Sequence, residues 1–136
     1  MTKRVIACLA LLVGALAQIA LALPDLVAVG LEISPVTPTD GALVTISATV
    51  ENTGRDDADD PFFIRFSVDN REIDVVPLPS LGSGRTKKLT TTWTAAAGPH
   101  VLSVKIDAPF DRFEEADEQN NSCSLYVKVR LDEEAM

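Results

Sequence analysis

The chain has 136 residues, with 12 lysines and arginines against 20 aspartates and glutamates, a formal net charge of −8. This length suffices for one domain, and so acidic a surface repels nucleic acid and anionic lipid, which excludes nucleic-acid binding. The single histidine and two cysteines argue against a zinc or copper centre.

Residues 1–22 predict a signal peptide. Lys3-Arg4 forms a short positive region, an apolar run covers residues 5–17, and Ala20-Leu21-Ala22 supplies the small-x-small pattern that signal peptidase accepts. Two alternatives stay open. One is an earlier cut after Ala15-Leu16-Ala17. The other is an uncleaved membrane anchor, since a bilayer span needs about 20 apolar residues.

Val5-Ile6-Ala7-Cys8 is similar to a bacterial lipobox, but most of the apolar segment follows Cys8, so we expect no lipid modification there. Removal of residues 1–22 leaves 114 residues with ten cations and 20 acids, a net charge of −10. We expect one folded domain over residues 23–131 and a frayed tail over residues 132–136.

Cys123 is the only cysteine left after removal of the signal peptide, so the exported domain is expected to have no internal disulfide. Cys123 alternates in step with Leu125, which predicts that it points into the core. A buried inert thiol is the favoured interpretation, with a reactive or intermolecular thiol as the alternative.

Alternation of apolar and polar residues with a period of two runs through the mature chain. Val44, Ile46, Ala48 and Val50 alternate with hydroxyl residues, as in a strand with one buried face. Seven strands are expected, starting near Leu26, Leu43, Phe62, Arg71, Thr86, His100 and Ser122. Seven short alternating strands in about a hundred residues indicate an all-β fold, a seven-stranded immunoglobulin-like antiparallel sandwich.

Three local patterns add detail to this sandwich. Asp69-Asn70 predicts a tight hairpin between two strands. Trp93 shares a face with Leu89 and Thr91, which predicts it as the largest core residue. Asp111 to Glu114 has the form of a capping box, which predicts one short helical turn.

Four features occur in order along the mature chain. They are Asn52-Thr53-Gly54, a phenylalanine-rich strand from Phe62 to Asp69, Trp93-Thr94, and the run from Glu115 to Asn121. In these features the sequence resembles the cell adhesion-related domain found in bacteria, the CARDB family. The resemblance implies a seven-stranded sandwich on exported or surface proteins of bacteria and archaea, with a role in binding or adhesion. The chain departs from the family pattern in its more acidic stretch, residues 56–60, and in being a lone module.

Two acidic loops are expected at one end of the sandwich, because the loops after its second and sixth strands share an end. The candidate metal ligands are Asp57, Asp107, Asp111, Glu115 and Glu118, with Asp56, Asp59, Asp60 and Asn120 nearby. An excess of carboxylate oxygens favours Ca²⁺, which takes roughly six to eight oxygen ligands. The alternative is a solvated rim that keeps a small exported protein soluble.

No nucleophile has a histidine neighbour that would activate it, since His100 is the only imidazole, so we predict no catalytic residues and no enzyme activity. We expect a secreted, cell-surface or periplasmic module of a bacterium or archaeon that binds an extracellular or envelope protein or glycan. The alternative is a structural subunit of a surface assembly or filament. Pro77 and Lys87-Lys88 weaken that alternative, because they are ordinary guards against edge-to-edge strand pairing.

Overall fold

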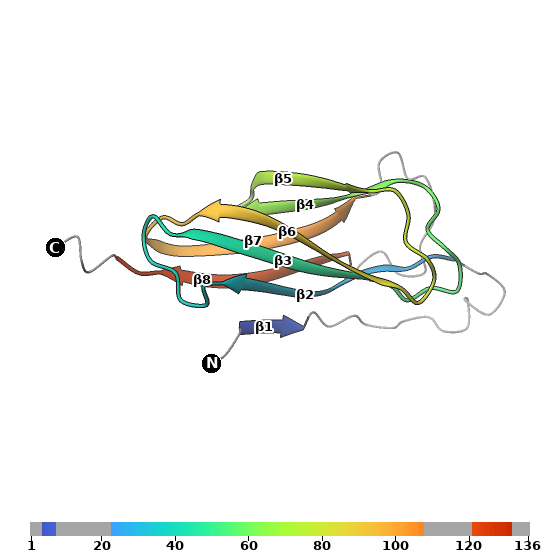
Figure 1. Ribbon diagram of the computed structural model, residues 1–136, viewed down its shortest axis with the longest axis horizontal. Helices are drawn as coiled ribbons and strands as arrows, with labels where there is room; N and C mark the ends of the chain where they lie inside the picture. The colour runs from blue at the N-terminus through green and yellow to red at the C-terminus, as the bar shows by residue number, and fades with distance from the viewer. Residues whose placement is uncertain (1–3, 8–22, 108–120, 132–136) are drawn as a thin grey trace.

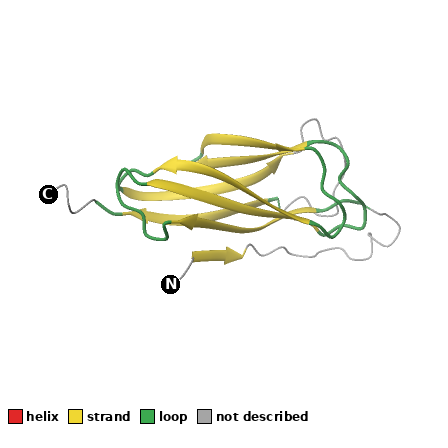
Figure 2. Cartoon of the chain, in the orientation of Figure 1, coloured by secondary structure: helices red, strands yellow, loops and turns green. Residues whose placement is uncertain are grey.

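The computed structural model describes residues 4–7, 23–107 and 121–131, and all regular structure in these ranges is β-strand (Figure 2). The strands are β1 (Arg4–Ala7), β2 (Leu26–Ser34), β3 (Leu43–Asn52), β4 (Phe62–Val68), β5 (Arg71–Leu78), β6 (Thr86–Thr94), β7 (Gly98–Asp107) and β8 (Ser122–Val129). Within the described ranges there is no helix long and apolar enough to cross a membrane.

Two antiparallel sheets, with strand orders β1-β2-β3-β6 and β5-β4-β7-β8, stack face to face (Figure 1). The predicted seven-stranded sandwich is therefore confirmed for β2 to β8. Six of these strands begin at the predicted residue, and β7 begins at Gly98 instead of His100. Pro77 and Lys87-Lys88 lie in β5 and β6, which are edge strands as expected of residues that block edge pairing.

The core lies between the sheets and follows from the alternation in each strand. Along β3, β4 and β8 every second residue is buried, because successive side chains of a strand point to opposite faces. Phe62 and Phe66 are the largest fully buried side chains. Trp93 was predicted for that place, and this prediction is wrong. It pairs with Val44 near the ends of β3 and β6, so it packs against the core only from its rim.

Two features of the structure were not predicted from the sequence. Arg4–Ala7, within the predicted signal peptide, forms β1 and pairs with β2. Cys123 is buried on the inner face, as the alternation predicted, but it is disulfide-bonded, so the expected free thiol is wrong for the full chain. The only other cysteine in the sequence is Cys8, outside the described residues.

The hairpin predicted at Asp69-Asn70 is confirmed. Both residues have positive φ angles, 53° and 67°, which suits a two-residue turn between twisted antiparallel strands. The helical turn predicted at Asp111 to Glu114 lies outside the described residues.

A buried side-chain amide, that of Asn52, joins three segments at one end of the sandwich. Its Oδ1 accepts hydrogen bonds from the backbone N–H groups of Asp25 and Gly54, both at 3.0 Å. Its Nδ2 donates to the carbonyl oxygens of Asp56 and Leu81, both at 2.9 Å. One amide thereby provides hydrogen-bond partners for backbone groups before β2, after β3 and between β5 and β6. It does so where the side chain is buried from water.

Gly54 completes this arrangement because no side chain fits there. A Cβ at this position would lie 2.1 Å from the carbonyl oxygen of Leu23 and 2.6 Å from the amide nitrogen of Asp25. The segment before β2 can therefore run directly over the backbone that follows β3. This close approach gives the Asn-Thr-Gly pattern of the sequence its structural reason.

Replacement of Asn52 by alanine should lower the free energy of unfolding by roughly 3 kcal/mol, because buried polar groups left unpaired cost about 1–3 kcal/mol each. Asn52→Asp should be at least as damaging near neutral pH. The carboxylate still accepts from Asp25 and Gly54 but places an oxygen against the carbonyls of Asp56 and Leu81. Urea unfolding of both variants measures this.

Thr90→Ala, on the exposed side of β6, is the matched control and should change the free energy of unfolding by no more than about 0.5 kcal/mol. An Asn52→Ala variant as stable as this control would contradict the role of the amide.

Candidate functional site

The β3–β4 and β7–β8 connections leave the sandwich at the same end, which we call the acidic pole. Phe63 pairs with Asp107, so the beginning of β4 lies beside the end of β7. The N–H of Ile106 donates to the carbonyl oxygen of Asn121 at 2.8 Å, which places the beginning of β8 there as well. Both acidic loops therefore start from one tip, as the sandwich topology predicted.

Asp57 is the one predicted metal ligand whose side chain is described. It is exposed, and its Oδ1 accepts a hydrogen bond from the backbone N–H of Ser83 at 2.7 Å. The Ser83 hydroxyl in turn donates to the carbonyl oxygen of Gly54 at 2.6 Å. The Asp57 carboxylate thus fastens the β3–β4 connection to the β5–β6 connection, a structural use that the sequence did not reveal.

The other candidate ligands are only partly placed. Asp107 is the last residue of β7, with its backbone described and its side chain not. Asp111, Glu115 and Glu118 lie outside the described residues. Within the described ranges no three histidine, cysteine, aspartate or glutamate side chains gather closely enough to hold a metal ion. The structure brings Asp57 and Asp107 to one pole and leaves the predicted ligand set untested.

An exposed apolar pair stands on the outer face of the β5-β4-β7-β8 sheet. Val101 and Tyr126 pair across β7 and β8, and they are 44% and 56% exposed. Their neighbours on one side of this face are Ser103 and Ser124, also paired, so small side chains lie on that side of the tyrosine. Sequence analysis did not single out Tyr126, although its place between two inward positions of β8 already put it outside.

Cations flank this apolar pair. Lys128 lies two residues from Tyr126 on the same face of β8, and Lys105 lies on the same face of β7; both are exposed. Arg65 pairs with Lys105 across β4 and β7, and its guanidinium forms a salt bridge with Glu72 of β5. We call Arg65, Val101, Lys105, Tyr126 and Lys128 the tyrosine face. Its excess of positive charge contrasts with the net charge of −8 of the whole chain.

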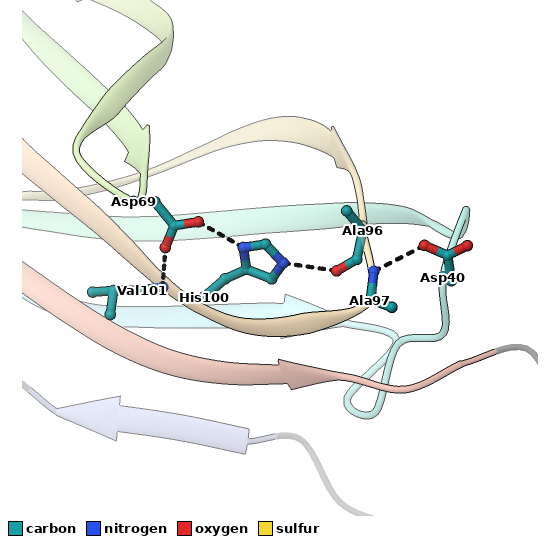
Figure 3. A network of polar contacts seen from close by, with 6 residues as sticks. All are labelled: Asp40, Asp69, Ala96, Ala97, His100 and Val101. Carbon is teal, nitrogen blue, oxygen red and sulfur yellow. Dashed lines mark hydrogen bonds and ion pairs between the residues drawn. The ribbon is translucent and has the colours of Figure 1, made fainter.

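The end opposite the acidic pole is held by a polar network around His100 (Figure 3). His100 Nδ1 lies 2.6 Å from Asp69 Oδ2, and His100 Nε2 lies 2.7 Å from the carbonyl oxygen of Ala96. Asp69 Oδ1 accepts from the N–H of Val101 at 2.9 Å. The network ties the β4–β5 turn, the start of β7 and the β6–β7 connection together.

Both ring nitrogens of His100 face groups that only accept hydrogen bonds. Each nitrogen must therefore carry a proton, so the geometry selects the charged imidazolium. The hydrogen bond to Asp69 accordingly raises the pKa of His100 above its ordinary 6.5, against the opposing effect of burial. The hydrogen bond from Val101, with that from His100, lowers the pKa of Asp69. The rings of Trp93 and His100 form a T-shaped contact, with the ring centroids 5.1 Å apart.

The raised pKa of His100 makes part of the stability depend on pH. Its contribution is complete below the unfolded histidine's pKa and is lost as the pH rises through the higher folded value. The parent's free energy of unfolding should therefore fall as the pH rises above the ordinary histidine pKa of 6.5, and His100→Gln should remove that fall. Urea unfolding at several pH values measures it.

Asp69→Asn is the matched variant, since asparagine keeps an oxygen for the N–H of Val101 and tolerates the positive φ of the turn. The pKa of His100, read by NMR from the only histidine in the chain, should drop in this variant. An unchanged pKa would contradict the assignment of Asp69 as its cause.

Similarity to known proteins includes a family model and a solved domain of the same family. The CARDB family model matches residues 23–125. The crystal structure of a Pyrococcus furiosus CARDB domain in complex with di-metal ions superposes with a TM-score of 0.71 at 24% identity, covering 83% of this chain and 99% of that one. A domain of a candidate cell surface protein from Methanosarcina acetivorans, solved by NMR, has a TM-score of 0.64 at 31% identity, covering 79% of this chain and 92% of that one.

No curated protein is similar enough to match. The family match covers most of the chain and agrees with the sequence pattern and the two stacked sheets described above. The chain belongs to the CARDB family.

Proposed function

We propose that this protein is an exported, non-enzymatic binding module that recognises a protein or glycan outside the cytoplasm. Membership of the CARDB family supports a cell-surface, adhesion-related role. The observation that carries the proposal is the tyrosine face, where an exposed aromatic ring stands among small side chains and cations on a rigid sheet.

Tyrosine suits such a surface because its ring offers apolar area while its hydroxyl stays available for a hydrogen bond. Exposed aromatic residues of this kind often contribute most of the binding energy of an interface. Lys128, two residues from Tyr126 on the same face of β8, and Lys105 farther along β7 favour a partner that carries carboxylates or other anionic groups, against the repulsion expected from the acidic remainder of the chain.

Tyr126→Ala should weaken binding to a partner isolated from the native cell envelope by about tenfold or more, because loss of a central aromatic contact costs about 2 kcal/mol or more. The same variant should unfold within about 0.5 kcal/mol of the parent, since its side chain lies outside the core. Calorimetric titration measures the first effect and urea unfolding the second.

Thr92→Ala, an exposed change on the other sheet, serves as the control and should leave binding unchanged. Equal affinity of Tyr126→Ala and Thr92→Ala would show that the partner does not bind at the tyrosine face. Weaker binding by Asp57→Asn would show that it binds at the acidic pole. The alternative function, a structural subunit of a surface assembly, is supported by the strand that pairs with the outer edge of β2.

We also infer that Ca²⁺ binds at the acidic pole. Two observations support this inference: the two acidic loops start from one tip, and a solved CARDB domain of similar fold is a complex with di-metal ions. Of the described side chains only Asp57 belongs to the predicted set, and one of its oxygens already accepts from Ser83. Asp107, Asp111, Glu115 and Glu118 would have to provide the remaining carboxylates.

Millimolar Ca²⁺ should raise the melting temperature by several degrees, because a ligand at about 100 times its Kd stabilises by about 2.7 kcal/mol. The double variant Glu115→Gln/Glu118→Gln should melt at the same temperature with Ca²⁺ and with chelator. If the melting temperature of the parent protein changes with neither Ca²⁺ nor chelator, the inference is wrong and the acidic residues form a solvated rim.

A further inference from the structure

The outer edge of β2 carries a fourth strand of its sheet. Arg4 to Ala7 pair antiparallel with Ile33 to Gly30, residue by residue and without a bulge (Figure 1). The sandwich itself consists of β2 to β8, and the described core residues all lie between Leu26 and Val129. β1 therefore adds to the edge of a sheet that is already complete.

This edge differs from the other edge of the same sheet and from that formed by β5. β6 carries Lys87 and Lys88, and β5 contains Pro77, and such residues discourage the addition of another strand. Gly30 to Ile33 of β2 has one charged residue, Glu32, and its carboxylate lies 3.1 Å from Lys88 Nζ across the outer face of the sheet. The salt bridge with Lys88 thus holds the carboxylate of Glu32 on the face of the sheet, where it does not block pairing of another strand with β2.

A bulge sets the limit of the accepting stretch. The register of β2 on β3 shifts between Ala28 and Gly30, and the pairs with β1 begin directly after that shift. Beyond it, Leu31 and Ile33 are buried in the core, and the register on β3 runs from Gly30 without a further shift. Gly30 to Ile33 therefore forms a short, regular edge with backbone groups directed outward.

We propose that this edge of β2 is a peptide-docking site, and that its occupant is an extended segment of a partner protein with the chemistry of Arg4–Ala7, a basic residue followed by a short apolar run. The pairing of β1 shows the direction of the occupant, and the sequence of Arg4–Ala7 gives its chemistry. The basic residue suits the acidic charge of the domain. If residues 1–22 are removed on export, the edge of β2 becomes free outside the cytoplasm, where such a partner is present. Strand addition of this kind takes its affinity from backbone hydrogen bonds.

The test uses residues 23–136, which contain the seven strands β2 to β8 and the whole described core, labelled with ¹⁵N, together with the full chain. The probe is a synthetic peptide of residues 2–8 with serine in place of cysteine. It should bind saturably to the domain and slow hydrogen exchange of the amides between Gly30 and Ile33. The full chain, whose edge is filled, should bind it at least about tenfold more weakly. The Ile6→Pro peptide should also bind about tenfold more weakly, because proline cannot donate to the strand ladder.

Three results would overturn the proposal. They are no change in exchange on adding the peptide, equal binding of the parent and Ile6→Pro peptides, and protection of Gly30 to Ile33 that rises with the concentration of the domain alone. The last result would identify a second copy as the occupant. Tyr126→Ala should bind the peptide as the parent does, so failure of this site and failure of the tyrosine face can be told apart.

Discussion

The structure depends on a single uncharged group, the side-chain amide of Asn52. In a sandwich whose sheets are joined by connections at their ends, backbone donors and acceptors of the crossing chain must find partners where water does not reach. Two acceptors and two donors of the surrounding backbone meet this one amide. No charged side chain could replace it, because the site needs both an acceptor and a donor from one planar group.

Different side-chain groups hold the connecting segments at the two ends of the sandwich. At the acidic pole a neutral amide binds the crossing segments, and the carboxylate of Asp57 adds one exposed contact. At the opposite end an ion pair between Asp69 and His100 holds the connections, so this end responds to pH. Asp40 joins the second arrangement by accepting from the N–H of Ala97 at 2.8 Å.

Local pattern predicted the sandwich well, because alternation decides which face of each strand is buried. Phe62 to Val68 and Ser122 to Val129 alternate so regularly that their first residues and inner faces follow from the sequence alone. Trp93 shows where this reasoning stops. Alternation places its side chain on the inner face, but only the three-dimensional position near the strand ends leaves it half covered.

The candidate sites were predicted less completely, since they depend on residues far apart in sequence. Asp69 and His100 are 31 positions apart, and the sequence offered a turn residue and an isolated imidazole with no reason to join them. Asn52 was recognised as part of a family pattern, but its partners Asp25 and Leu81 lie more than twenty positions away. Cys123 was assigned correctly to the inner face, while its disulfide depends on a residue that the predicted signal peptide removes from consideration.

The positions of the domain's two ends have a mechanical consequence. Residue 23 enters at the acidic pole, where the N–H of Arg55 donates to the carbonyl oxygen of Leu23, and the chain leaves at the opposite end, where Arg130 exchanges hydrogen bonds with Pro38 and Asp40. A pull applied to the two ends of the domain would therefore run along the long axis and load β2 and β8 lengthwise. Many lateral hydrogen bonds would share that load at once instead of opening one after another.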